Sequence, residues 1–335
     1  MMKKLLALLA ITAAVTTGGC GNAPASPGGE KPVTIGLLRL TSSAPVFIAL
    51  DKGFFKEENL DVKPVWFGAA QPISVAAASN TIDIGATGLT ASIYNMAAAG
   101  RPVIITADKG QEHQGFRSSS LIVRKDAGID DVEDLRGKTF GMTTAGSSFQ
   151  YMMGNILDAE GIPQEEVEFL PLRSLGSVMA AVKTGKADSA VVNEPNGTKS
   201  ERAGWGKVVT SVGDVIQYQT SAIFYSPSFA SDYDQGVRFM KAYIRACRWY
   251  YDNVLTNKDH DSPEFKEGIS IISRYTKAPE KDIILGLPWL DRDGRLLDGD
   301  IEKQIQWYQD RHLVRGNVPP MTNLSYWEEA ERELS

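Results

Sequence analysis

Small hydroxyl side chains gather around one glycine in the stretch from Thr139 to Tyr151. The stretch begins as a short apolar run, typical of a buried strand, and continues from Phe149 with the spacing of a helix. The first N–H groups of a helix lack partners and carry the positive end of its dipole. We therefore predict a site for a small anion or polar head group, with an ordinary helix cap as the alternative. The residues concerned are Thr143, Thr144, Gly146, Ser147 and Ser148.

Polar residues also follow the other expected strands. In open α/β sheets, ligands bind beyond the carboxyl ends of the strands, where loops enter helices. That rule selects the loops 41–44, 67–71, 87–90, 144–148, 173–174 and 193–194. The uncharged candidates for ligand binding in these loops are Thr41, Ser42, Ser43, Gln71, Thr87, Gly88, Thr144, Gly146, Ser147, Ser148 and Asn193.

Three charged candidates favour opposite kinds of ligand. Arg117 and Arg173 are suited to pairing with a carboxylate or sulfonate through two parallel hydrogen bonds, or else they are surface charges. Glu194 suits an amino group or a protonated ring, as in a zwitterion, or else it caps the next helix. The sequence leaves these alternatives open.

Two residues with rings complete the candidate site. Trp66, which Phe67 follows, is suited to stacking on a planar ligand, although aromatic residues at a strand end also cover the core. His113 lies near the expected crossing between the two halves of the chain. It is either a ligand contact or a residue of the solvated rim.

Several kinds of chemistry lack their motifs. Gly-x-x-x-x-Gly-Lys-Ser/Thr does not occur, so the chain is not predicted to be an ATPase. Cys-x-x-Cys, His-Glu-x-x-His and Gly-x-Ser-x-Gly are also missing and the three histidines are scattered, so we expect no metal and no cofactor. A net charge of −6 and a pI near 5.3 argue against a nucleic-acid partner.

The N-terminus predicts export. Two lysines precede an apolar run at 5–15 that is too short to span a bilayer. Thr17-Gly18-Gly19-Cys20 then resembles a bacterial lipoprotein signal, in which Cys20 is lipidated; cleavage without lipidation is the alternative. We expect a signal peptide over 1–20 and a flexible linker over 21–32, rich in Pro, Gly and Ser. Cys247, in an apolar helical stripe, is then a core residue without a disulfide partner.

The order of elements indicates an α/β fold. Apolar strands alternate with helices of about ten residues from 33 to 107, which predicts βαβ units. A second α/β series follows from 119 to 225, and the pattern from Tyr233 onward is helical. The predicted strands are 33–38, 60–66, 81–86, 102–107, 119–123, 167–170, 189–192, 207–210 and 222–225, and one more at the beginning of the stretch 139–151.

Ordered segments of the chain resemble the NMT1/THI5-like substrate-binding proteins, which include sulfonate, taurine, nitrate and thiamine-pyrimidine binding components of ABC importers. The likeness covers roughly 33–225. It rests on 44–62 (Ala-Pro-Val-Phe-Ile-Ala-Leu-Asp-Lys-Gly-Phe-Phe-Lys-Glu-Glu-Asn-Leu-Asp-Val), Asp83-Ile84-Gly85, Thr87-Gly88, Asp134-Leu135-Arg136-Gly137-Lys138, Gly146-Ser147-Ser148, Gly185-Lys186-Ala187-Asp188 and Glu194-Pro195.

The resemblance implies a two-lobed periplasmic-binding-protein fold of type II, in which two mainly parallel sheets flanked by helices close on a ligand about a hinge. Lobe one would span 33–116 and 220–335, with the helical C-terminal tail packed on it, and lobe two 117–219. Residues at positions that commonly line the cleft in this family would be Ser42, Ser43, Thr87, Gly146, Ser147, Ser148 and Glu194.

The implied function is ligand capture for an ABC importer. The protein would be a monomer, anchored outside the cytoplasm by lipidated Cys20, that delivers a small organic anion or zwitterion to a permease with its ATPase. A planar nitrogen heterocycle or an aromatic acid is the alternative ligand. A sensor domain is a further alternative, and so is a pyrimidine synthase, although that enzyme's cysteine-rich motif is missing here.

Overall fold

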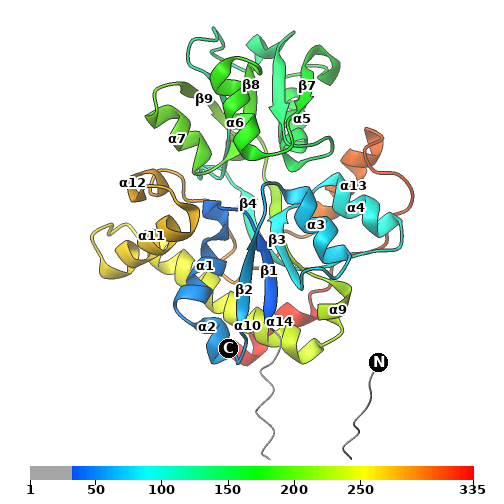
Figure 1. Ribbon diagram of the computed structural model, residues 1–335, viewed down its shortest axis with the longest axis vertical. Helices are drawn as coiled ribbons and strands as arrows, with labels where there is room; N and C mark the ends of the chain where they lie inside the picture. Colours follow the sequence, from blue (N-terminus) through cyan, green and yellow to red (C-terminus); the bar gives the residue numbers. More distant parts are fainter. Residues whose placement is uncertain (1–31) are drawn as a thin grey trace, which may run out of the picture. The chain divides into compact units, whose positions relative to one another are not determined.

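The computed structural model describes residues 32–335. The expected signal peptide, Cys20 and the linker through residue 31 lie outside the described residues. In the described part of the chain, no helix combines the length and the apolar character that crossing a bilayer requires. The described residues form two five-stranded sheets, each covered by helices (Figure 1). We call each sheet with its helices a lobe: lobe one holds the first strand, and lobe two is the upper, green part of Figure 1.

The sheet of lobe one has the strand order β2-β1-β3-β10-β4. β1 pairs in parallel with β2 and β3, while β10 runs antiparallel to β3 and β4. Because β10 enters this sheet from the other lobe, it runs against its neighbours. The bounds are β1 Val33–Leu37, β2 Val62–Trp66, β3 Ile84–Gly88, β4 Ile104–Glu112 and β10 Tyr218–Tyr225.

The sheet of lobe two repeats this plan in the order β7-β6-β8-β5-β9. β6 is parallel to β7 and β8, and β5 is antiparallel to β8 and β9. In each sheet four strands therefore run in one direction and a single strand, β10 or β5, runs against them, which agrees with the mainly parallel sheets that we expected. The bounds are β5 Ser119–Arg124, β6 Thr139–Met142, β7 Glu168–Pro171, β8 Ser189–Asn193 and β9 Gly206–Ser211.

Apolar helices cover both faces of the first sheet. One core joins its strands to α1, α10 and α11, and includes Cys247, which is fully buried as predicted. A second core lies under α3 and α4 on the other side. The helices are η1 Thr41–Ser43, α1 Ala44–Asp51, α2 Phe54–Glu57, α3 Ala70–Ala78, α4 Ala91–Ala98, α9 Pro227–Ala230, α10 Tyr233–Tyr250, η4 Tyr251–Leu255, α11 Pro263–Thr276, α12 Glu280–Ile283 and α14 Ser325–Leu334.

The helices of lobe two are shorter and fewer. α5 is the longest of them and presents a continuous apolar face to the second core. Their bounds are η2 Glu133–Leu135, α5 Ser148–Ala159, η3 Gln164–Glu166, α6 Leu175–Thr184, α7 Asn196–Arg202 and α8 Val212–Val215.

One helix of the C-terminal tail touches both lobes. α13 (Asp300–Asp310) contacts α4 of lobe one and α5 of lobe two. The hydroxyl of Tyr308 donates to the carbonyl of Ser147 at 3.2 Å, and Arg311, which follows α13, pairs with Asp158 at 2.8 Å. The tail is therefore not confined to lobe one, because the aromatic residues of α13 pack against the apolar face of α5.

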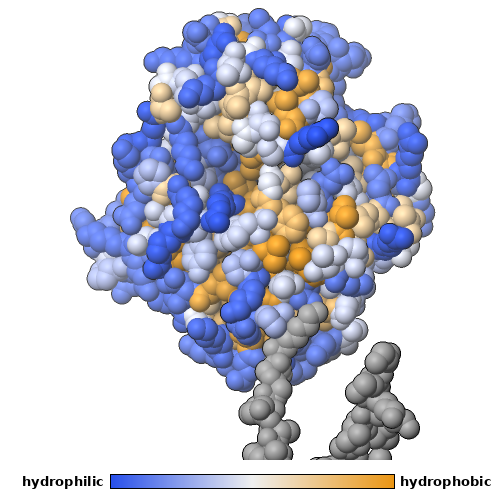
Figure 2. Space-filling model, viewed as in Figure 1, coloured by the Kyte–Doolittle hydropathy of each residue, from blue (hydrophilic) through white to orange (hydrophobic). Residues whose placement is uncertain are grey.

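The face of the molecule seen in Figure 2 carries both hydrophilic and hydrophobic side chains. Hydrophilic side chains dominate the rim, and hydrophobic atoms gather toward the middle of this face. The exposed large apolar side chains of the described residues are scattered along the chain: Val75, Tyr233, Ile284 and Leu285.

Candidate ligand-binding site

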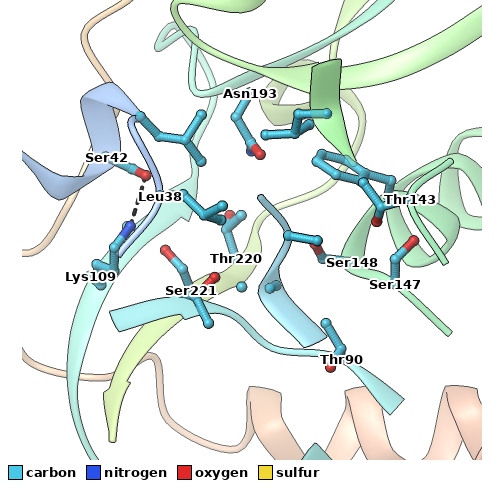
Figure 3. Close-up of a pocket in the computed structure, with 18 of the residues that line it drawn as sticks. Leu38, Ser42, Thr90, Lys109, Thr143, Ser147, Ser148, Asn193, Thr220 and Ser221 are labelled. Carbon is cyan, nitrogen blue, oxygen red and sulfur yellow. Dashed lines mark hydrogen bonds between the residues drawn. The ribbon is translucent and has the colours of Figure 1, made fainter. Parts of the chain in front are cut away.

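A cavity lies where the two sheets meet, and both lobes contribute to its wall (Figure 3). The empty space bounded by its lining atoms, together with the solvent at its mouth, amounts to about 630 Å³. The lining residues are Leu38, Leu40, Ser42, Ala69, Ala70, Gln71, Thr87, Gly88, Thr90, Lys109, Gly110, Ser118, Thr143, Thr144, Ser147, Ser148, Phe149, Leu175, Asn193, Thr220, Ser221 and Pro288.

The fold places strand ends around this cavity. Thr87 and Gly88 end β3, Asn193 ends β8, and Thr143 follows the last residue of β6. Each of these three strands is parallel to a neighbour in its sheet, so the carboxyl ends face the same edge. The walls are therefore built from loops and strand ends of both lobes.

Helix α5 begins at the cavity wall. Ser147 caps the helix by accepting a hydrogen bond from Gln150 N, and the side chain of Gln150 accepts one from Gly146 N at 2.7 Å. The capping alternative is thus realised in part. The N–H groups of Ser148 and Phe149 have no acceptor among the described residues, which leaves the start of the helix able to bind an anion.

Among the described residues, Lys109 is the one charged residue of the cavity wall. It lies on β4, only 2% of it is exposed, and its ammonium donates to the hydroxyl of Ser42 at 2.9 Å. Burial lowers the pKa of Lys109 to about 7, and the nearby carboxylate of Asp108 opposes that shift. No Asp or Glu from residues 32–335 lines the cavity, so its electrostatic character is set by a cation and neutral groups.

Three buried hydroxyls of the cavity wall have no hydrogen-bond partner among the described residues. They belong to Thr87, Thr90 and Ser221. Buried polar groups without partners are rare in folded proteins, because each loses its bonds to water. Together with the ammonium of Lys109, these hydroxyls form a set of donors suited to the oxygens of a small polar ligand.

The lobes touch around the cavity through backbone hydrogen bonds. The shortest joins Ala91 N at the start of α4 to the carbonyl of Gly146 over 2.8 Å. Two more join Thr41 N to Glu194 O and Leu175 N to Gly68 O. The cleft is therefore closed in this structure.

Half of the residues predicted for the site line the cavity, and they come from both lobes. They are Ser42, Gln71, Thr87, Gly88, Thr144, Ser147, Ser148 and Asn193. The side-chain amide of Asn193 is already engaged, since it donates to Ser119 Oγ at 2.7 Å.

Three small candidates lie beside the cavity without lining it. Thr41 donates through both its N–H and its hydroxyl to the carbonyl of Glu194, so its polar groups join the lobes. Ser43 is fully buried at the start of α1. Gly146 has φ of 72° and lies against Ala91, a close approach that a side chain would prevent.

The charged candidates are also outside the cavity. Arg117 and Glu194 form an ion pair 2.8 Å long with each other, and Glu194 also accepts from Thr198 N at 3.0 Å. Arg173 is exposed on the loop before α6, where its N–H bonds to Thr143 O. The groups expected to set the charge of the site are therefore not on its wall.

The two candidates with rings pack elsewhere. The guanidinium of Arg39 lies 4.0 Å from the ring centre of Trp66, so that ring is stacked within the protein. His113 stacks on Trp289 with ring centres 4.6 Å apart. Both residues lie outside the cavity wall.

Sequence reasoning missed the β4 and β10 side of the site. The missed polar residues are Lys109, Ser118, Thr220 and Ser221. We predicted strand 102–107, but β4 continues to Glu112 and carries Lys109 into the cavity. No local signal marked this extension, because Asp108 to Glu112 is polar and has the composition of a loop.

The residues described offer no metal centre. No group of three or more His, Cys, Asp or Glu is placed to hold an ion in the described part of the chain. The donors of the cavity wall are hydroxyls, N–H groups and one ammonium, which suit an anion and not a cation.

Sequence comparison identifies the family. The model described as NMT1/THI5 like matches residues 40–253, more than half of the chain. The chain belongs to the NMT1/THI5-like family.

Two relatives from Bacillus subtilis (strain 168) are named as binding proteins. The chain is 30% identical to YtlA over 213 residues, which is 62% of each chain. It is 24% identical over 259 residues, 76% of each chain, to a protein named as an aliphatic sulfonates-binding protein. The match to YtlA thus spans a little less than two thirds of that protein's length.

A solved structure shares the fold. It is the alkanesulfonate-binding protein SsuA from Xanthomonas axonopodis pv. citri bound to MOPS, with a TM-score of 0.73 and 16% identity. The match covers 90% of this chain and 100% of that one. The expected two-lobed periplasmic-binding-protein architecture is therefore confirmed.

Proposed function

We propose that this protein is the extracytoplasmic solute-binding component of an ABC importer, which closes its lobes on a small organic anion and delivers it to the permease. One observation carries the proposal: a closed cavity between two lobes presents partnerless hydroxyls, a helix N-terminus and one ammonium, and no carboxylate. The relatives named as binding proteins support it.

An anion suits the cavity better than a zwitterion. The amino group of a zwitterion needs a carboxylate or several acceptors, and Glu194, the acid expected to supply this, is paired with Arg117. A sulfonate or carboxylate, in contrast, accepts hydrogen bonds from the ammonium and hydroxyls of the wall. The preferred ligand class is therefore a monoanion.

An aromatic acid is the second candidate. Phe149 lines the cavity beside Leu38, Leu40 and Leu175, so part of the wall is apolar. A ligand with a ring and one acidic group would contact both kinds of surface. A neutral heterocycle has less support, because Trp66 is covered by Arg39.

Mass spectrometry of ligand released from protein purified without denaturation tests this function. Thermal shift assays with alkanesulfonates, taurine, aromatic sulfonates, aromatic carboxylates and a thiamine pyrimidine then rank the classes, because a ligand that binds the native state raises its stability. We expect the monoanions to raise the melting temperature most. Stabilisation by none of them would overturn the proposal, and turnover of the pyrimidine would favour a synthase.

Membrane attachment belongs to the same proposal. A lipid anchor at Cys20 would hold a monomeric binding protein beside its permease. The variant Cys20→Ala should then appear in the soluble extracytoplasmic fraction, whereas the unaltered protein sediments with membranes. A permease and an ATPase encoded beside the gene would favour uptake, and a membrane kinase in their place would favour a sensor.

A further inference from the structure

The surroundings of Lys109 leave its charge without a partner. The ammonium contacts the hydroxyl of Ser42, no salt bridge to it exists among the described residues, and only 2% of the residue is exposed. An ammonium that loses water needs an anion or several acceptors in return, and one hydroxyl replaces only a part of its hydration.

The carboxylates near Lys109 are bound by other groups, and among the described residues none of them forms a salt bridge with it. On β4 itself, Asp108 is bound by Gln219 and by the N–H groups of Gly110 and Asp291. Glu112 accepts from Thr220 at 3.5 Å, and burial raises its pKa to about 8.

The segments next to Lys109 contribute either uncharged residues or carboxylates that already have hydrogen-bond or ion-pair partners. Asp291 accepts from the N–H groups of its own turn. Glu194, next to Thr41, is paired with Arg117. η1 and the cavity-facing part of β10 contribute Ser42, Thr220 and Ser221, all uncharged.

We infer that Lys109 makes closure of the cleft conditional on an anion. The inference rests on the proposed function and deepens it. When the lobes part, water reaches the ammonium; when they close on an empty cavity, the charge is buried with one hydroxyl as its partner. An acidic group on the ligand supplies the missing counter-charge, and a neutral molecule of the same shape does not.

Because the charge of Lys109 depends on its protonation, closure of the ligand-free cleft should depend on pH. Lys109 in the closed, empty cleft has a pKa near 7, whereas a solvated lysine titrates at about 10.4. The closed, empty state therefore releases the proton more readily than the open state. Raising the pH from 7 to 10 should thus favour empty closure, and lowering it should favour the open form.

Spin-label distances on the ligand-free protein test the inference. Labels on V75C in α3 and E165C in η3 report the separation of the lobes at two exposed positions, in a Cys20→Ser background; Cys247 is fully buried and does not compete. We expect the closed fraction of the otherwise unaltered protein to rise from pH 6 to pH 9. In Lys109→Met it should be high and independent of pH, and in Lys109→Arg low throughout.

Two controls make the outcome decisive. Lys63→Met removes an exposed lysine of the same lobe and should leave the distances unchanged. Thermal melts should show Lys109→Met folded and no less stable than its parent, because the substitution removes a buried charge. Equal closed fractions in the parent and Lys109→Met would overturn the inference.

Ligand measurements separate this inference from the proposed function. Lys109→Met should bind an anion about 100-fold more weakly, since loss of one partner of a buried charge pair has effects of that order. If no ligand were found for the unaltered protein, the proposed function would be overturned. The spin-label distances of the ligand-free protein would still test whether Lys109 opposes closure of the cleft.

Discussion

The guanidinium of Arg117 lies 2.8 Å from the carboxylate of Glu194, whose side chain is fully buried while 26% of the Arg117 side chain is exposed. A second guanidinium nitrogen pairs with Glu201 at 2.7 Å. Two residues predicted to bind opposite charges on a ligand therefore neutralise each other inside lobe two. Lys109 is thus the one charged side chain that the described residues contribute to the cavity wall.

Loss of Arg117 should destabilise the fold. Arg117→Met leaves the buried Glu194 unpaired, which should lower the free energy of unfolding by about 3 kcal/mol. Burial raises the pKa of Glu194 and Arg117 opposes that shift, so without Arg117 the carboxyl takes up a proton more easily. The deficit should therefore be larger at pH 8 than at pH 5 in urea titrations. Arg117→Lys, which keeps the charge, is the control, and equal stability of all three proteins would contradict the assignment.

Removing the partnerless hydroxyls should affect binding more than folding. Thr87→Val keeps the shape of the side chain but deletes a donor to the ligand, so the anion should bind about tenfold more weakly. Stability of the empty protein should stay equal or rise, because a buried hydroxyl without a partner is lost.

A bonded hydroxyl outside the cavity provides the control for Thr87→Val. Ser200 is buried and donates to the carbonyl of Gly197 at 2.7 Å. Ser200→Ala should lower the melting temperature and leave the dissociation constant unchanged. Calorimetric titration and thermal melts on both variants measure the two effects, and the reverse pattern would place Thr87 outside the site.

A side chain at Gly146 should keep the lobes apart. A Cβ there would lie 2.5 Å from the Cβ of Ala91 across the cleft, and φ is 72°. Gly137 has φ of 73° with open space around it, so Gly137→Ala shares the backbone strain of about 1 kcal/mol without the clash.

Both glycine variants should therefore lose similar stability, but only one should lose affinity. We expect Gly146→Ala to bind the anion at least tenfold more weakly than Gly137→Ala, because closure contributes the contacts of the second lobe. Equal dissociation constants would show that Ala91 and Gly146 need not meet for binding.

Glu112 should make the protein less stable as the pH rises. Burial raises its pKa to about 8, whereas a glutamate in an unfolded chain titrates at about 4.3. The folded protein thus holds a proton that the unfolded chain releases, and this contribution is lost as the pH rises through 8. Glu112→Gln has nothing to titrate, so its melting temperature should fall less between pH 5 and pH 8. Asp108 and Lys109 are present in both proteins, so their titrations do not account for the difference.

The alternation of strands and helices was predictable from sequence because the strands and helices each bury an apolar face, which leaves a local pattern. The same local logic found the loops that end β3, β6 and β8, which carry Thr87, Thr144 and Asn193. It failed for β4, because the polar residues from Asp108 to Glu112 are covered by the C-terminal segment near Trp289, far away in sequence.

Side-chain partners were the part that the sequence could not supply. Arg117 and Glu194 are separated by 76 intervening residues, and the sequence around either residue does not indicate that they form an ion pair. The same holds for Arg39 on Trp66 and for the lone contact of Lys109 with Ser42. Residue types suggested a polar site, but only tertiary packing decides which charges remain available to a ligand.

The position of α13 limits how the molecule can move. Two stretches of chain, from Glu112 to Ser119 and from Ser211 to Tyr218, join the lobes, and two attachments define a pivot line. Tyr308 of α13 bonds to Ser147 at the cap of α5, and Arg311, just after α13, pairs with Asp158 of α5, so the lobes are also joined at a third place by a helix that contacts α4. Swinging about the pivot must either release these bonds or drag α13 away from α4. The far end of the chain thus acts as a mechanical stop on the opening of the cleft.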